Sequence, residues 1–412
     1  MPAKAMAFES TSRHSASEST APEPAISSPA PLHVLTLTPF FPSLENDVHG
    51  CFIKEPLDFL TQQGIASSVI AASALHRPRR KSSPAAPATW VRYPQFPGYL
   101  GLPGAGRLLY ARLLPLVSRM HRERPIKLIH AHAALPCGRA AALLGRRLQI
   151  PFVVTVHGLD VFNAGALVGN RAEFLRQASI AVYQAAKTVV CISAKVRQIM
   201  HEGMPSCVRS AVVYNGVDPE LFSPSMADGS AANEILVVGN LIPTKGQELV
   251  VKAIHRMAAD FPELQCRIIG EGPDRSRLEA LAHERGINQR IRFEGRQSRA
   301  AVADAMRRCS VFVLPSRNEG LGCVYLEAMA CAKAVVACRG QGIEEVIQHK
   351  KNGWLIPPDS VDELVDALST LLGSSDVPSR IGIAARQTIL NRFTLSQQAQ
   401  KLVGVYCEAV VR

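Results

Sequence analysis

The sequence predicts an α/β protein with two domains, each built on a parallel β-sheet. Short runs rich in Val, Ile and Leu alternate with longer helical patterns along nearly the whole chain. Most of these runs are continuously apolar, which is typical of parallel strands covered by helices on both faces. The alternation stops at residues 219–234, where Pro, Ser, Gly and Asp cluster, and then starts again. The length of 412 residues also exceeds the size at which a single core stops growing.

The predicted strands fall into two groups of six, with helices between them. The first group is residues 32–38, 67–73, 127–133, 151–158, 188–193 and 210–216. The second group is residues 234–240, 265–272, 290–295, 310–316, 333–338 and 353–357. In open sheets of this kind, ligands bind at the carboxyl ends of the strands. The turns that follow the strands are therefore where we expect the functional residues.

The chain is expected to divide into five segments. These are a disordered tail (1–30), an N-terminal Rossmann-like domain (31–218), a linker (219–233), a C-terminal Rossmann-like domain (234–390) and a C-terminal helix (391–412) that packs back on the first domain. The tail is rich in Ala, Ser, Pro and Glu and has no central apolar block, so it resembles neither a signal peptide nor a structured element.

Composition and charge indicate in which cellular compartment the protein works and which kinds of partner it binds. Hydrophobic residues make up 47% of the chain and charged residues 19%, as in a soluble globular protein. The net charge is +12, and residues 1–230 hold 23 basic and 14 acidic side chains, which suits nucleic acid, an anionic membrane surface or a phosphorylated substrate. The ten cysteines are scattered without a C-x-x-C pair, so we expect the cytosol. No run approaches the roughly 18 apolar residues of a spanning helix, so any membrane contact is expected to be peripheral, at the inner face.

Two common nucleotide-binding motifs are missing from the sequence. The first turn, TPFFPSLENDVHG, lacks G-x-G-x-x-G, and no G-x-x-x-x-G-K-[ST] occurs. The turn GEGPDRSRL (270–278) lacks the third glycine of the dinucleotide fingerprint and is expected to be a tight turn into a helix. These observations speak against a typical nicotinamide-binding unit and a P-loop NTPase.

Two carboxylates, Glu319 and Glu327, stand within or beside the apolar stretch SRNEGLGCVYLEAMACAKAVVAC (316–338). If a helix starts near Gly322, Glu319 lies in the loop before it and Glu327 on its second turn. A buried carboxylate needs hydrogen-bond donors or takes up a proton. The donors are either a buried Arg or backbone amides, or they are the hydroxyls of a ligand such as a ribose and a hexose. The loop Gly320-Leu321-Gly322 favours the second interpretation, because it lets backbone amides approach phosphate oxygens.

Other candidates are individually weaker. Lys245 lies in the loop that opens a helix and is either a phosphate contact or simply solvated. His157, with Gly158 and Asp160, is either a contact to a sugar hydroxyl or phosphate, or a structural histidine. His130 and His132 are expected to point to opposite faces of a strand and so not to share a metal ion.

Together these pieces resemble one family. The segments are HG-x-D (157–160), NGVD (215–218), VGNL with KG (238–246), GEGP (270–273) and PSRNEGLGCVYLEAMA (315–330). In this order and spacing they are similar to retaining nucleotide-sugar glycosyltransferases of family 4, which have the GT-B fold of two Rossmann-like domains facing each other across a cleft. The resemblance covers roughly residues 32–410, and the E-x7-E pair is its most specific element.

The resemblance implies roles for the donor-binding residues. Glu327 would hold the ribose hydroxyls of the nucleotide. Glu319, with the amides of Gly320, Leu321 and Gly322, would hold the donor sugar. Lys245 would neutralise the diphosphate.

Three further positions follow from the same resemblance. His157 would sit near the reacting carbon and, with Glu319, belong to the catalytic residues, whereas Gly50 would let the backbone approach the phosphates. Asn240, at a donor-binding position, replaces the Arg of many members, so the cationic clamp is reduced by one charge. Arg317 and Arg139 are the possible substitutes.

The resemblance also implies a reaction. A hexosyl unit would move with retention from a nucleoside-diphosphate sugar to a glycan or lipid-linked acceptor, in cell-surface polysaccharide or glycolipid biosynthesis. The first domain would bind the acceptor. Catalysis would rest on positioning and charge stabilisation more than on a protein nucleophile. We expect no metal and no other cofactor, because no Asp-x-Asp cation site is visible.

Two alternatives stay open. One is a GT-B nucleotide-sugar epimerase, and the other is a non-catalytic basic protein that binds nucleic acid. We expect no nucleic-acid partner, because aromatic and basic residues are not interleaved in the first half. Residues 93–125 contain a leucine-rich helical pattern, which is either a core-facing helix or a surface for anionic lipid. Its apolar residues are Leu108, Leu109, Leu113, Leu116 and Val117.

Overall fold

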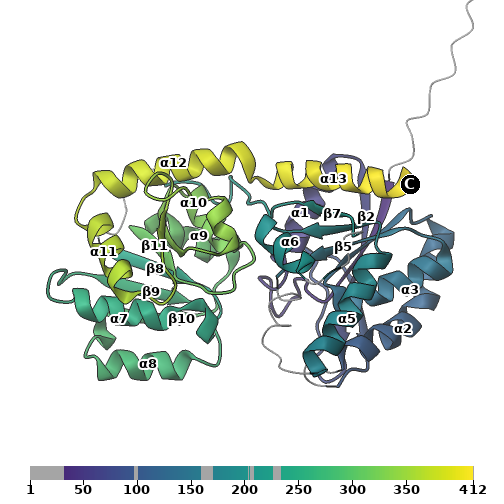
Figure 1. The fold of residues 1–412 in the computed structure, drawn as a ribbon, viewed down its shortest axis with the longest axis horizontal. Helices are drawn as coiled ribbons and strands as arrows, with labels where there is room; N and C mark the ends of the chain where they lie inside the picture. The colour runs from purple at the N-terminus through teal and green to yellow at the C-terminus, as the bar shows by residue number, and fades with distance from the viewer. Residues whose placement is uncertain are drawn as a thin grey trace, which may run out of the picture. The chain divides into compact units, whose positions relative to one another are not determined.

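The computed structural model describes residues 32–96, 101–158, 170–202, 204, 208–225 and 233–411. They belong to one unit, Leu32–Arg412, which contains a seven-stranded and a six-stranded sheet (Figure 1). The predicted tail, residues 1–30, lies outside the described residues.

The seven-stranded sheet has the order β3-β2-β1-β4-β5-β6-β7, and every neighbouring pair is parallel. Its strands are β1 (Leu32–Thr38), β2 (Ile65–Ala74), β3 (Thr89–Tyr93), β4 (Leu128–His132), β5 (Phe152–Val156), β6 (Thr188–Cys191) and β7 (Ser210–Val212). Its helices are α1 (Cys51–Gln62), α2 (Leu102–Glu123), η1 (Ala134–Gly138), α3 (Arg139–Leu148), α5 (Asn170–Ala185) and α6 (Ala194–His201). The central strands β4, β5 and β6 are buried along their whole length, as their continuous apolar runs predict.

The edge strand β3 is the one strand of this sheet that the sequence did not predict. Its sequence TWVRY is half-buried, it follows the Pro-rich stretch SSPAAPA, and Arg92 interrupts its apolar residues. An edge strand has a neighbour on one side only, so it needs no long apolar run.

The six-stranded sheet is also wholly parallel, with the order β10-β9-β8-β11-β12-β13. Its strands are β8 (Glu234–Val238), β9 (Gln265–Ile269), β10 (Ile291–Gly295), β11 (Val311–Leu314), β12 (Ala334–Cys338) and β13 (Trp354–Ile356). Each begins within one residue of the predicted start. The predicted ends run past some strands, because glycine turns such as Gly270 carry the chain out of the sheet.

Helices cover both faces of this second sheet (Figure 1). They are α7 (Gln247–Met257), α8 (Arg275–Glu284), α9 (Arg299–Arg308), α10 (Cys323–Ala330), α11 (Val361–Leu372) and α12 (Asp376–Arg392), with the short helices η2 (Pro243–Lys245), η3 (Asn288–Arg290) and η4 (Gly342–Glu345). In Figure 1, α7 and α8 lie on one side of the sheet, and α9 and α10 lie on the other.

The last helix, α13 (Leu395–Val411), packs on the seven-stranded sheet. Its residues Leu402 and Tyr406 share a buried cluster with Val34 of β1 and Leu128 of β4. Two backbone hydrogen bonds join Val217 to the turn before this helix: Val217 N donates to Phe393 O (2.9 Å), and Leu395 N donates to Val217 O (3.1 Å). The predicted linker falls between the last strand of one sheet and the first strand of the other, so we propose it as the domain boundary.

The leucine-rich helix of the first half is α2, and most of its apolar residues face the core. Leu109, Leu113 and Val117 are fully buried, whereas Leu108 is 46% exposed. The core-facing interpretation therefore holds for these three residues. Within the described part of the chain, no helix combines the length and the apolar character needed to cross a membrane.

Candidate active site

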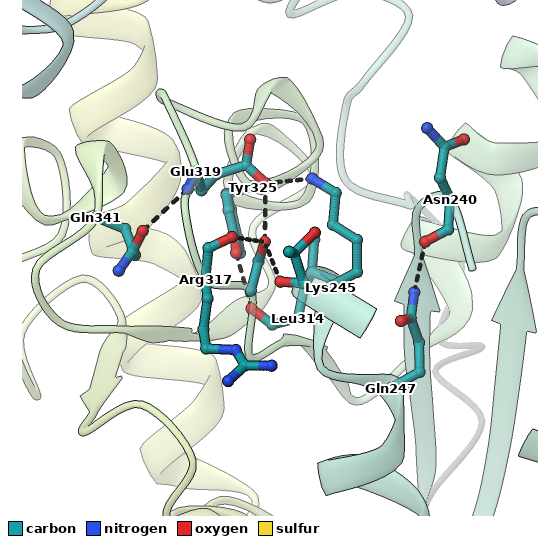
Figure 2. Close-up of polar contacts among 10 residues, drawn as sticks. Asn240, Lys245, Gln247, Leu314, Arg317, Glu319, Tyr325 and Gln341 are labelled. Atoms are coloured by element: carbon teal, nitrogen blue, oxygen red, sulfur yellow. Dashed lines mark hydrogen bonds and ion pairs between the residues drawn. The ribbon is translucent and has the colours of Figure 1, made fainter. Parts of the chain in front are cut away.

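The loop before α10 holds the first predicted carboxylate, Glu319. Its Oε2 accepts a hydrogen bond from Ser316 Oγ (3.2 Å) and forms an ion pair with Lys245 (Figure 2). Its backbone N–H donates to Gln341 Oε1 (2.9 Å), and its carbonyl accepts from Gly342 N (3.0 Å). The side chains of Glu319 and Lys245 are 13% and 22% exposed, so both remain within reach of a ligand. Sequence reasoning missed Gln341 and Gly342, which lie beyond β12.

The second carboxylate, Glu327, is buried, with 3% of the residue exposed. Its Oε1 accepts a hydrogen bond from Arg299 Nη1 (2.5 Å). Its Oε2 is also buried and has no hydrogen-bond partner among the described residues. Oε1 is therefore paired with an arginine, which is one of the donors that the sequence analysis allows, whereas Oε2 lacks a donor among the described residues. Because an unsatisfied buried acceptor is costly, Oε2 is the atom that a ligand hydroxyl would satisfy.

Arg299 is a residue that sequence reasoning missed. It begins α9, after Ser298 caps the helix by accepting a hydrogen bond from Ala301 N. Arg299 Nε donates to Glu55 Oε1 of α1 (2.9 Å), so the arginine joins two carboxylates. Burial lowers the pKa of Arg299, but Glu327, Cys51 and Glu55 together raise it above its ordinary value, so the side chain stays charged. Burial raises the pKa of the Glu55 carboxyl.

The glycine loop lies against the first domain. Gly320 O accepts a hydrogen bond from Ser193 Oγ, the residue that caps α6 (2.6 Å). A Cβ added at Gly320 would lie 3.2 Å from the carbonyl oxygen of His157. Gly322 has φ +81° and stands just before α10, where a side chain would be strained, and Leu321 is fully buried. The loop and His157 are therefore neighbours.

The three histidines form a cluster that corrects the sequence prediction. His130 and His132 do not point to opposite faces of β4: their ring centroids are 4.2 Å apart. Residues i and i+2 of a strand lie on the same face, so the predicted opposition was wrong. His132 Nδ1 and His157 Nε2 are hydrogen-bonded (2.9 Å), and His130 bonds Tyr406 of α13 and Thr155 of β5 (both 2.7 Å). Within the described ranges, no group of three or more His, Cys, Asp and Glu side chains is arranged so that it could hold a metal ion.

His157 has one ring nitrogen that a ligand could use. Burial lowers its pKa to about 3, so the ring is neutral. Its Nδ1 is buried and makes no hydrogen bond to any described residue, while Phe52 and Phe40 pack on the ring at centroid distances of 5.0 and 6.4 Å. Asp160, predicted to act with His157, lies outside the described residues.

The remaining predicted positions occupy separate turns. Gly50, with φ +81°, precedes α1, and a Cβ there would lie 2.5 Å from Phe40 C, so only glycine fits. Asn240 is exposed, and its carbonyl accepts from Gln247 Nε2 (2.9 Å) (Figure 2). Arg317 pairs with Asp359 at the surface (3.1 Å). Arg139 begins α3 and packs beside Gly106 of α2.

A cavity of about 510 Å³ lies in the first domain. It is lined by residues at or after the carboxyl ends of β1 to β4, among them Pro39, Ala74, Tyr93 and Ala133. Phe40 belongs to its lining and also contacts His157. This is the position where ligands bind in open α/β sheets.

Gly342→Ala is expected to lower the free energy of unfolding by about 2 kcal/mol, within the range for overpacking. A Cβ at this position would lie 1.8 Å from Gly320 O, which is backbone and cannot rotate away. Thermal or denaturant unfolding measures the loss. Gly404→Ala is the control, because nothing lies within 4 Å of a Cβ added in the middle of α13. Equal stabilities of the two variants would contradict the tight packing of this loop.

Comparison with known proteins identifies the family. The model of glycosyl transferases group 1 matches residues 225–388, and that of glycosyltransferase family 4 matches residues 53–221. A D-inositol 3-phosphate glycosyltransferase of Stackebrandtia nassauensis is 32% identical over 310 residues, which are 69% of this chain and 68% of that protein.

Solved structures show the same fold. Sucrose-phosphate synthase from Thermosynechococcus elongatus superposes with a TM-score of 0.74 at 20% identity, over 91% of this chain and 98% of that one. HepE of Anabaena in complex with UDP-glucose gives a TM-score of 0.70 at 19% identity, over 91% of this chain and 99% of that one. The chain has the GT-B fold and belongs to the group 1 glycosyltransferases of family 4, enzymes that use a nucleotide-sugar donor.

Proposed function

We propose that the enzyme transfers a hexosyl unit, with retention at the anomeric carbon, from a nucleoside-diphosphate sugar to a glycan or lipid-linked acceptor. The observation that carries this proposal is the buried Oε2 of Glu327, an acceptor without a donor among the described residues. It lies on the helix whose preceding loop carries the Lys245–Glu319 pair. In our proposal, a ribose hydroxyl of the nucleotide donates to this oxygen.

The Lys245–Glu319 ion pair supports a proposal in which both side chains change partners when the donor binds. Lys245 turns from the carboxylate to the diphosphate, whose charge it neutralises. Glu319 then accepts hydrogen bonds from hydroxyls of the hexose, and the backbone N–H groups of Gly320 to Gly322 donate to oxygens of the donor sugar. Each charge keeps a partner throughout, so neither is left unpaired in a partly buried site.

The proposed reaction needs no protein nucleophile. The bond from the anomeric carbon to the phosphate oxygen breaks, and the acceptor oxygen attacks the same face of the sugar. The acceptor proton passes to the leaving phosphate oxygen, and Lys245 stabilises the charge that develops there. We assign the neutral His157 to the donor sugar beside the reacting carbon, where its Nδ1 is the free hydrogen-bonding group. Gly50 allows the backbone to approach the diphosphate.

We assign the acceptor to the cavity of the first domain. Phe40 lines this cavity, and its ring also packs against His157. We also propose that the enzyme works in the cytoplasm, at or near the inner face of a membrane. The excess positive charge of residues 1–230 and the absence of cysteine pairing among the described residues support this location.

A thermal-shift screen with UDP-, GDP- and ADP-sugars tests the donor assignment. A donor at 100 times its dissociation constant is expected to stabilise the chain by about 2.7 kcal/mol. UDP-glucose is the first choice, because it is the ligand of the HepE structure. Free mannose and glucose are controls that lack the nucleotide. No shift with any nucleotide sugar would contradict the proposal, and a rearranged sugar formed without an acceptor, seen by NMR, would favour an epimerase.

A further inference from the structure

The cavity of the first domain has an apolar wall. Leu102, Leu135, Ile180 and Met200 line it. Sugar hydroxyls that face these four side chains would have no hydrogen-bond partners there, which costs free energy. An apolar group would instead gain from leaving water, at about 25 cal/mol for each Å² buried. The wall therefore suits a ligand with a hydrocarbon body.

Two arginines, Arg77 and Arg80, line the same cavity and come from the loop after β2. Within the described ranges, neither forms an ion pair, whereas Arg176, also in the lining, is paired with Glu173. The Arg80 guanidinium lies 5.7 Å from the ring centroid of Trp90, another lining residue.

The charge of Arg77 also acts on Arg80. Burial lowers the pKa of Arg80, and the positive charge of Arg77 lowers it further, more than the Glu45 carboxylate raises it. Arg80 is half-buried and Arg77 is exposed, and like charges near each other repel unless an anion lies between them. Two guanidinium groups form the hydrogen-bond donor set that a phosphate prefers.

We propose that this cavity is the acceptor site and that the acceptor is a phosphate-bearing amphiphile, whose hydrocarbon body fills the cavity while its phosphate binds Arg77 and Arg80. This inference rests on the proposed transfer reaction and names the substrate class of that site. Phe40 lines the cavity and its ring also packs against His157, so in this proposal the acceptor lies one side chain from the donor.

Decyl phosphate, used below its micelle concentration, is a suitable probe. The sequence has two tryptophans, so a Trp354→Phe variant leaves Trp90 in the cavity wall as the single fluorescent reporter. We expect saturable binding of decyl phosphate, and binding at least tenfold weaker for 1-decanol and for inorganic phosphate. Calorimetric titration of the unmodified chain gives the same comparison without the tryptophan change.

The chain offers a charge-matched pair of variants for this test. Arg77→Gln/Arg80→Gln is expected to weaken decyl phosphate binding at least tenfold. Arg79→Gln/Lys81→Gln removes the same charge from exposed residues of the same loop that do not line the cavity, and it is expected to change binding less than twofold. Equal losses in both would overturn the proposal in favour of general electrostatics.

Two further outcomes would also overturn it. One is equal affinity for 1-decanol and decyl phosphate, which would remove the phosphate subsite. The other is binding only to anionic vesicles, with no saturable binding of the monomeric probe, which would indicate docking on a membrane surface. The nucleotide-sugar thermal shift is measured on the same samples. A normal shift with failed probe binding overturns the acceptor inference alone, whereas a missing shift in the wild type overturns the proposed function.

Discussion

Replacing Glu327 by alanine is expected to abolish the thermal shift given by the nucleotide sugar and to lower the free energy of unfolding by about 3 kcal/mol. The stability loss arises because Arg299, whose side chain is 16% exposed, would keep its charge but lose one of its two carboxylate partners. Breaking one side of a buried ion pair typically costs about 3–5 kcal/mol. The binding loss arises because the free Oε2, our proposed ribose acceptor, disappears with the side chain. Circular dichroism melts with and without donor measure both effects.

A second pair of variants separates binding from stability. Glu327→Met/Arg299→Met/Glu55→Gln removes all three charges of this group and keeps similar volume, so we expect most of the stability to return while donor binding stays lost. Glu55→Gln weakens the other partner of Arg299 but leaves Glu327 intact, so donor binding should remain. A full donor shift in Glu327→Ala would contradict the ribose assignment.

Most strands could be predicted from the sequence, because each has a local pattern of apolar residues. Buried parallel strands must be apolar on both faces, so strands such as β5 and β11 stand out as short continuous runs. The exception is β3, a half-buried edge strand in which Arg92 interrupts the apolar residues, so it has no continuous apolar run. What positions it is its pairing with β2, and no local signal encodes that pairing.

The donor loop was predictable for the same reason, and its partners were not. The residues from Glu319 to Glu327 are consecutive in sequence, so their order predicted a loop, a glycine turn and a helix start. The groups that hold them come from distant segments: Arg299 is 28 positions before Glu327, and Ser193 is 127 positions before Gly320. Such contacts depend on the tertiary fold.

The histidine cluster shows how an error of periodicity changes an interpretation. The prediction that His130 and His132 point to opposite faces is wrong, because two-residue spacing puts them on one face of β4. That face also receives Tyr406 from the end of the chain, 276 positions after His130. The correct periodicity would have predicted the His130–His132 contact but not the tyrosine, which arrives with α13.

Lys245→Ala is expected to lower the turnover rate at saturating acceptor at least about 100-fold, the scale for removing one donor to a developing oxyanion. In our proposal the effect is large, because the position proposed for a second cation holds the neutral Asn240. Lys245→Ala would also leave Glu319 without its ion-pair partner, so its charge would repel the diphosphate. Lys245→Arg keeps the charge and should recover part of the rate. Steady-state kinetics and the affinity for free nucleoside diphosphate measure the loss.

Two control variants test whether the effect of Lys245 depends on its position in the site or only on its positive charge. Lys252→Ala removes a half-exposed lysine that pairs with Glu248 on α7, and we expect less than a twofold change in rate. Arg317→Ala tests the candidate substitute for the missing clamp. Since Arg317 already pairs with Asp359 at the surface, we expect a loss of about threefold or less. A larger loss for Arg317→Ala than for Lys245→Ala would transfer the phosphate role from the loop before α7 to the loop before α10.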